Sequence, residues 1–323
     1  MAKRLRIAAG AAAATALFAG AALTSRAPNV PAAFAPRPAA PALVRLGAGA
    51  PDIAADTVLI QRLRTGEELF GRNADAPRPV ASLTKLMTAL LLAEAADPLD
   101  IVSFSAEAGS AGDPDEKRSA VPTGERLRVE DTLRLLLAAS DSDAAYAAAE
   151  HVAVRRRPEL AGTPFAARIE AFVGLMDERA HVLGLAATRF ANPAGSDDPR
   201  AAATANDLAR LAGYITSRHP ELWAASRVRE GFAFGAGGRQ GRASPPAGRR
   251  YGIVNTNPLL EEFPAVYGSK TGFDDLARGA LLMVYRLSAQ EPIAIVILRS
   301  PDRTSDGRAA IRWLESSFML ESP

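Results

Sequence analysis

The stretch that decides the fold is residues 82–96, SLTKLMTALLLAEAA. Nearly all of these residue types are strong helix formers. Pro79 stands just before the stretch and Asp97-Pro98 follows it, which is typical of the two ends of a helix. We therefore predict a helix over residues 82–96.

The segments on either side of this helix predict a sheet built from both ends of the domain. Their patterns predict, in order, strands at 57–63 and 67–70, helices at 129–154 and 165–185, strands at 279–287 and 292–299, and a closing helix at about 306–320. Strands at both ends with helices between them favour one α+β unit whose sheet unites the two ends.

Length and composition exclude several classes of protein. The chain has 323 residues, of which 48% are hydrophobic and 23% charged, so it is neither mainly disordered nor a multi-span membrane protein. It has no cysteine, which excludes thiol catalysis, disulfides and thiolate metal sites. It has only three histidines, and they show no HExxH spacing, so the sequence does not favour a histidine zinc site or a Ser-His-Asp triad. We expect no metal, no cofactor and no nucleic-acid partner.

The first 50 residues are predicted to precede the folded domain. Residues 1–27 resemble an export signal, because a basic start precedes an uncharged alanine-rich stretch with Ala19-Gly20-Ala21 as a cleavage box. A cleaved signal and a retained N-terminal anchor both stay open. Residues 28–50 are rich in proline and alanine and predict an extended linker, which leaves 51–323 as the domain. Either form of the signal predicts export to the periplasm or another extracytoplasmic part of the cell envelope.

Lysine is scarce in this chain. Of 38 basic residues only four are lysine, namely Lys3, Lys85, Lys117 and Lys270. Arginine supplies positive charge elsewhere, but arginine cannot lose its proton in a protein. A remaining lysine is therefore a candidate for work that requires deprotonation.

Ser82 and Lys85 form the only Ser-x-x-Lys in the sequence. They lie at i and i+3 in the first turn of the predicted helix, so their side chains share one face. A serine hydroxyl becomes a good nucleophile when a base takes its proton, and an amine can be that base once burial or a second cation lowers its pKa. The motif alone also fits a helix that begins at a serine and carries a surface lysine.

Two further motifs follow in the sequence. Ser140-Asp-Ser-Asp143 comes after an apolar run, and Ser140 could pass a proton from the base to the leaving group. Taken alone, it also fits a polar loop that caps the next helix. In Ser269-Lys-Thr-Gly272, Lys270 could supply the second cation and bind a substrate carboxylate, while the glycine allows close approach to a ligand. A turn with an exposed lysine is the plainer interpretation of this motif.

Together, Ser-x-x-Lys, Ser-x-Ser and Lys-Thr-Gly resemble the signature of penicillin-binding proteins and serine β-lactamases. The surroundings, such as Thr188-Arg-Phe-Ala-Asn-Pro193 and Asn255-Thr-Asn-Pro-Leu-Leu260, resemble the low-molecular-weight D-alanyl-D-alanine carboxypeptidases, peptidase family S11. The resemblance spans about residues 53–320. It implies a β-lactamase/transpeptidase-like α+β fold: a five-stranded antiparallel sheet flanked by helices, beside an all-helical lobe. We expect the sheet from 51–80 and 250–323 and the lobe from about 96–230.

The resemblance also implies the activity and the roles of individual residues. Ser82 would attack the penultimate D-Ala carbonyl of a peptidoglycan stem peptide and would bind β-lactam antibiotics covalently. The other implied roles are Lys85 as base, Ser140 as proton donor to the departing D-Ala, Lys270 and Thr271 as holders of the terminal carboxylate, Gly272 as the position of close backbone approach, the N–H groups of Ser82 and Phe273 as the oxyanion hole, and Arg308 as a further carboxylate ligand.

The chain departs from the family pattern at Ser142, where the family has asparagine. A hydroxyl can replace only part of the hydrogen bonding of an amide. Three alternatives stay open: a DD-endopeptidase with the same machinery, a serine β-lactamase with Glu159 as the residue that activates water, and a non-catalytic wall-binding relative.

Overall fold

The computed structural model describes residues 42–47, 49–112, 117–118, 120–236, 248–289 and 291–320. The predicted export signal and most of the predicted linker lie outside the described residues. Among the described residues, no helix combines the length and the apolar character that a membrane span requires.

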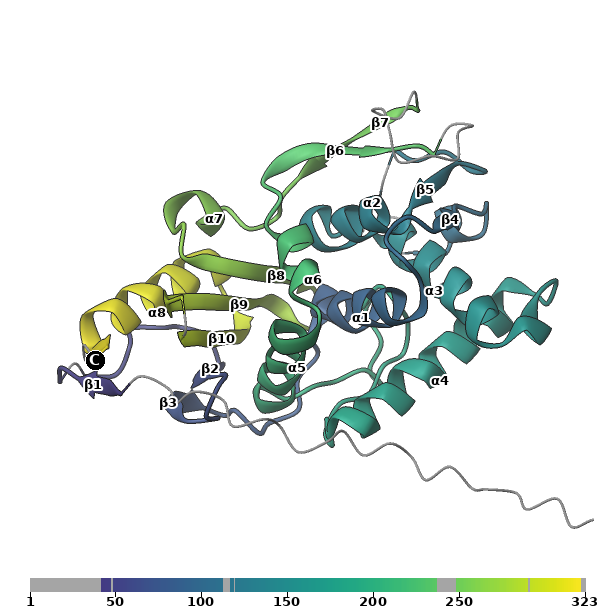
Figure 1. The fold of residues 1–323 in the computed structure, drawn as a ribbon. Coiled ribbons are helices and arrows are strands. Elements are labelled where there is room, and N and C mark those ends of the chain that lie inside the picture. The colour runs from purple at the N-terminus through teal and green to yellow at the C-terminus, as the bar shows by residue number, and fades with distance from the viewer. Residues whose placement is uncertain are drawn as a thin grey trace, which may run out of the picture. The chain divides into compact units, whose positions relative to one another are not determined.

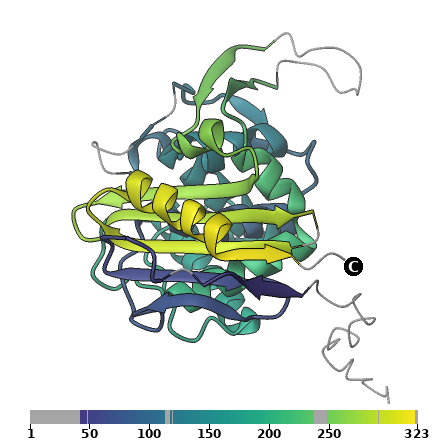
Figure 2. The same cartoon turned by 90° about the vertical axis from the view of Figure 1, so that its left-hand side faces the viewer.

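The centre of the domain is a five-stranded antiparallel sheet (Figures 1 and 2). Its strands are β2 (Thr57–Arg62), β3 (Glu68–Arg72), β8 (Val266–Asp274), β9 (Arg278–Ser288) and β10 (Glu291–Ser300), in the order β3-β2-β10-β9-β8. Ile295 of β10 pairs with Ile60 of β2 on one side and with Met283 of β9 on the other. The prediction of a five-stranded sheet that unites both ends of the domain is confirmed.

The two faces of the sheet are covered by different helices, because successive side chains along a strand point to opposite faces. Leu282, Val284 and Val296 belong to the large core shared with the helical lobe. Their neighbours Met283 and Ile295 belong to the second core, under the last helix. Figure 2 shows that helix, α8 (Arg303–Ser317), lying across its face of the sheet. The apolar side of α8 is therefore core.

The remaining elements form the lobe, short hairpins and connections. The helices and helical turns are η1 (Ala81–Thr84), α1 (Lys85–Ala95), η2 (Ala108–Ser110), α2 (Val129–Arg134), the π-helix η3 (Leu135–Ala139), α3 (Ser142–Arg156), η4 (Pro158–Leu160), α4 (Phe165–Leu183), α5 (Ala205–Arg218), α6 (Pro220–Ser226) and α7 (Leu259–Glu262). The small antiparallel pairs are β1 (Leu43–Arg45) with β11 (Phe318–Leu320), β4 (Ile101–Ser103) with β5 (Arg126–Arg128), and β6 (Glu230–Phe234) with β7 (Arg250–Val254).

Two boundaries differ from the sequence-based expectation. α5 falls within the range expected for the helical lobe, but it packs against β2 and β10 of the sheet. β1 falls within the expected linker, yet it pairs with β11, and the carbonyl of Gly49 accepts a hydrogen bond from the Trp313 indole at 2.6 Å. Residues before position 51 therefore also contact the domain.

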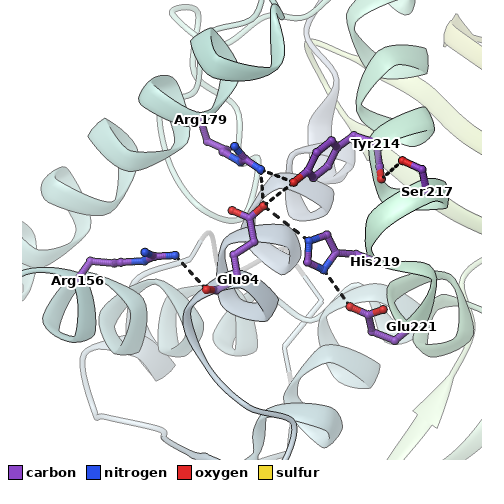
Figure 3. Close-up of polar contacts among 7 residues, drawn as sticks. All are labelled: Glu94, Arg156, Arg179, Tyr214, Ser217, His219 and Glu221. Atoms are coloured by element: carbon purple, nitrogen blue, oxygen red, sulfur yellow. Dashed lines mark hydrogen bonds and ion pairs between the residues drawn. The ribbon is translucent and has the colours of Figure 1, made fainter. Parts of the chain in front are cut away.

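Helix α1 lies between the sheet and the lobe (Figure 1). All its residues from Lys85 to Leu92 are buried, as expected for a helix that is apolar on every side. Its far end is held by Glu94, whose carboxylate accepts hydrogen bonds from Arg179 of α4 at 2.5 Å and from Tyr214 of α5 at 3.3 Å (Figure 3). The Glu94 carbonyl also accepts from Arg156 of α3 at 3.0 Å. These contacts fix the axis of α1 and with it the residues at its start.

Candidate active site

Ser82 lies in η1, immediately before α1, on a strained stretch of backbone. The residue before it, Ala81, has φ +49°, a left-handed conformation that costs a non-glycine residue free energy and persists where the surroundings enforce it. The loop at Gly195 supplies such a contact. A Cβ at Gly195 would lie 2.1 Å from the Ala81 carbonyl oxygen, so no larger residue fits. Asn192 shapes this loop, since its side-chain oxygen accepts from the N–H of Gly195 at 2.7 Å.

Lys85 is buried directly beneath Ser82. Its Nζ lies 2.9 Å from Ser82 Oγ, 3.3 Å from Ser142 Oγ and 2.7 Å from the carbonyl oxygen of Ala194. The lysine side chain is 1% exposed, so little water competes for these contacts. The amine is in hydrogen-bond reach of the hydroxyl that it would deprotonate.

Ser140 and Ser142 enter the site through a tight change of direction. The π-helix η3 ends at Ala139, the next residue, Ser140, reverses the chain with a φ of +61°, and α3 begins at Ser142. Asp141 caps α3 by accepting from the N–H of Ala144 at 2.8 Å. This conformation brings both hydroxyls to the same cleft as Lys85. π-Helical turns are rare and are frequent at functional sites.

Lys270, on β8, closes the other side of the cleft. Its Nζ donates to Ser140 Oγ at 2.7 Å and to the Thr271 carbonyl at 2.8 Å. Burial is the largest cause that holds the pKa of Lys270 well below 10.5, and the charge of Lys85 is the next. The charges of Arg303 and Lys117 lower this pKa further. Burial and the neighbouring cations therefore disfavour the charged form of Lys270.

Gly272 brings β8 against the start of α1. A Cβ at this position would lie 2.9 Å from the Val80 carbonyl and 3.1 Å from the Ser82 nitrogen, so the sheet edge and η1 approach as closely as backbones can. The next residue, Phe273, has a side chain that is 63% exposed. The oxyanion hole formed by the N–H groups of Ser82 and Phe273 stays a prediction, and this close approach favours it.

Arg308 forms its hydrogen bonds with a residue outside the site. On α8 its Nε donates to both carboxylate oxygens of Glu262, at 2.8 and 2.9 Å, rather than to a site residue. Arg303, five residues earlier on α8, is the arginine whose charge acts on Lys270. The role of Arg308 as a carboxylate ligand stays a prediction, and Arg303 is a second candidate for it because its charge acts on Lys270.

Thr256 is a residue of the site that the sequence did not reveal. Its Oγ1 lies 2.5 Å from Oγ1 of Thr271, and its N–H donates to the Ala138 carbonyl at 3.1 Å. It thus connects the chain just before Ser140 with the strand that carries Lys270. The neighbouring Asn257 donates to Ser269 Oγ at 3.0 Å and supports the same strand. The polar run Asn255-Thr-Asn257 is visible in the sequence, but the sequence pattern alone does not assign Thr256 a role.

A family model for D-alanyl-D-alanine carboxypeptidases matches residues 45–301, and the three motifs lie within that range. The chain belongs to this family, peptidase S11. The S11 chain is 29% identical to the D-alanyl-D-alanine carboxypeptidase DacF of Bacillus subtilis over 82% of its own length, but it spans only 62% of that relative. It is 26% identical to the D-alanyl-D-alanine endopeptidase of Escherichia coli over 90% of its length and 86% of the relative.

A solved structure agrees on the fold of this S11 protein. The Streptomyces K15 DD-transpeptidase aligns with a TM-score of 0.71 and 23% identity, over 82% of this chain and 98% of that one. At this identity the likeness supports the fold, including the expected transpeptidase-like α+β architecture. Among the described residues, no group of three or more His, Asp or Glu side chains is placed to hold a metal ion.

Replacing Thr256 with valine is expected to lower kcat for D-Ala release by about 5- to 20-fold, which corresponds to the loss of one hydrogen bond to Thr271. Steady-state kinetics on a pentapeptide measure this effect. Thr256→Ser keeps the hydroxyl and is expected to restore most of the rate. Equal losses in both variants would contradict a role for the hydroxyl and would point to packing instead.

The lowered pKa of Lys270 predicts a pH-dependent contribution to stability. Between its lowered folded pKa and the unfolded value of 10.5, the unfolded state holds a proton that the folded state lacks, so stability rises with pH in this window. The slope is at most about 1.4 kcal/mol per pH unit for one group. Urea unfolding between pH 7 and 10 is expected to show a steeper rise for the wild type than for Lys270→Met. Parallel curves would contradict this prediction.

Proposed function

We propose that this S11 protein is a serine-type D-Ala-D-Ala carboxypeptidase that removes the terminal D-Ala from peptidoglycan stem peptides. The observation that carries the proposal is a pair of contact groups built from the three motifs: Lys85 contacts Ser82 and Ser142, and Lys270 contacts Ser140. The link from Lys85 to Ser82 is 2.9 Å, and that from Lys270 to Ser140 is 2.7 Å. The nucleophile is thereby in reach of a buried base, and the second proton carrier is in reach of Lys270.

In the proposed reaction, Lys85 takes the proton of Ser82 while Oγ forms a bond to the penultimate D-Ala carbonyl carbon. The N–H groups of Ser82 and Phe273 stabilise the resulting oxyanion. The C–N bond then breaks, and a proton passed through Ser140 leaves with the amine of the terminal D-Ala. Water hydrolyses the remaining ester and restores Ser82. Lys270 and Thr271 hold the terminal carboxylate until the C–N bond breaks and the terminal D-Ala leaves.

Labelled penicillin tests the acyl-serine mechanism directly. We expect intact-mass analysis to give one stable adduct, peptide mapping to assign it to Ser82, and a pentapeptide assay to release D-Ala. Absence of an adduct would support a non-catalytic relative instead. Rapid loss of the adduct would favour a β-lactamase, for which Glu159 was the sequence-based candidate. Glu159 is exposed in η4, beyond the 15 residues of α3 that begin at Ser142. A helix of this length spans about 22 Å, so that glutamate is remote from Ser82.

A DD-endopeptidase is the second candidate, on one specific observation. The chain matches 86% and 81% of the lengths of the two endopeptidases, from E. coli and Pseudomonas aeruginosa, against 62% for the B. subtilis carboxypeptidase. Parallel assays on a pentapeptide and on a cross-linked muropeptide dimer separate the two activities. Faster cleavage of the dimer would assign the chain to the endopeptidases.

The proposed substrate requires a location outside the cytoplasm. We propose export by the signal at 1–27, with residues 28–50 leading to the catalytic domain. Detection of the mature protein in the cell envelope fraction, with N-terminal sequencing to establish whether the signal is cleaved, tests this. β-Lactams would reach Ser82 in the same compartment.

Replacing Ser142 with asparagine is expected to raise the rate of D-Ala release. Ser142 is 1% exposed and its Oγ lies 3.3 Å from Lys85 Nζ, where an amide could both accept from the lysine and donate to the substrate backbone. The gain is expected to be roughly 5- to 150-fold, equivalent to about 1 to 3 kcal/mol. An unchanged or lower rate in a folded variant would contradict this placement of Ser142.

A further inference from the structure

Lysines gather at the candidate active site. Beyond the predicted leader the chain has only three, against 34 arginines in the whole sequence. Lys85 and Lys270 are buried in the cleft. The third, Lys117, is exposed, and its carbonyl accepts the N–H of Ser142 at 2.9 Å. All three therefore meet at one place, although 185 positions separate Lys85 from Lys270 in the numbering.

The charge of Lys117 acts on the buried lysine of β8. It is one of the cations that lower the pKa of Lys270, after burial, Lys85 and Arg303. The adjacent Arg118 forms an ion pair with Asp143 at 3.3 Å, and Asp141 caps α3. With the residues that the structure describes, Lys117 forms no ion pair. The surface next to the start of α3 thus carries an exposed positive charge.

We propose that the ammonium of Lys117 binds a carboxylate of the stem peptide beside Ser142, an inference that rests on the proposed function. A stem peptide offers such groups at its C-terminus and on its D-Glu residue. An exposed ammonium on a flexible four-carbon stem suits a carboxylate whose position varies, whereas a planar guanidinium demands a fixed bidentate geometry. Lys85 and Lys270 act on the reacting C-terminal end of the peptide, whereas Lys117 would bind a carboxylate in the part of the peptide outside the reacting end.

Equilibrium binding to the Ser82→Ala protein tests this without turnover. Three peptides serve as probes. The first is L-Ala-γ-D-Glu-L-Lys-D-Ala-D-Ala with a free D-Glu carboxylate, the second is the same peptide with that group amidated, and the third is diacetyl-L-Lys-D-Ala-D-Ala, which has only its C-terminal carboxylate. NMR titration gives Kd with and without Lys117→Gln. Arg312→Gln, on α8 at the other face of the sheet, is the matched control for loss of an exposed charge.

We expect Lys117→Gln to raise Kd for the first peptide about 2- to 5-fold, the size of an exposed ion pair, and to leave the other two unchanged. Lys117→Arg keeps the positive charge and is expected to restore only part of the binding, because a guanidinium demands a more fixed geometry. An equal rise for all three peptides would assign the contact to the C-terminal carboxylate. Unchanged Kd for all three, or an equal change in Arg312→Gln, would overturn the inference. The penicillin adduct and D-Ala release of the wild type test the proposed function separately.

Discussion

Ser82→Ala is expected to form no adduct with labelled penicillin and to lose D-Ala release by about 10³- to 10⁶-fold, the loss typical of removing a nucleophile. The Ser82 hydroxyl lies on η1, 2.9 Å from the Lys85 amine that is proposed to deprotonate it. Its removal leaves the binding groups of the cleft intact. The variant should therefore still bind substrate while it fails to turn it over.

Intact-mass analysis and a pentapeptide assay measure both effects. Ser110→Ala, at an exposed serine of η2, is the control and should match the wild type. A full adduct on Ser82→Ala would show that another residue is the nucleophile. Ser140 would be the next candidate, because it contacts Lys270. Unchanged thermal unfolding of the variant excludes a loss caused by misfolding.

The features that sequence predicted are those that local patterns encode. Helix formers between proline and Asp-Pro defined α1 within one turn, and the apolar runs at 279–287 and 292–299 became β9 and β10. The order of the motifs predicted that Ser82, Ser140 and Lys270 would lie in one site; in the structure Ser82 is bonded to Lys85, and Lys270 is bonded to Ser140. The scarcity of lysine was informative because arginine can replace lysine where only positive charge is needed, but not where a proton must be lost.

The features that sequence did not predict depend on contacts between distant segments. The third contact of Lys85 is the carbonyl of Ala194, and a backbone carbonyl has no residue-type signal. The left-handed Ala81 is set by the close approach of Gly195, which lies 114 positions away in the numbering. Thr256 acts through Thr271, so its role emerges only from their 2.5 Å approach. α5 reads as a helix of the lobe, but its packing partner is the sheet.

Lys85→Arg is expected to lower the rate of Ser82 acylation by about 10²- to 10⁴-fold, the contribution typical of a general base. Arginine keeps the positive charge and the hydrogen-bond donors, but it cannot give up its proton. The variant thereby separates a base from a cation that merely stabilises negative charge. Stopped-flow measurement of penicillin acylation gives the rate, and substrate binding to the folded variant controls for distortion of the cleft.

Lys270→Arg is the matched comparison, because both lysines are 1% exposed and both substitutions add the same bulk to a buried site. Overpacking costs about 1 to 3 kcal/mol in either variant, so it cancels in the ratio of the two acylation rates. If Lys85 is the base and Lys270 the cation, Lys270→Arg retains far more activity than Lys85→Arg. The lowered pKa of Lys270 sharpens the comparison, since a neutral amine at 270 could also accept a proton through Ser140. A larger loss in Lys270→Arg would reverse the two roles and make Ser140 the group through which Ser82 is deprotonated.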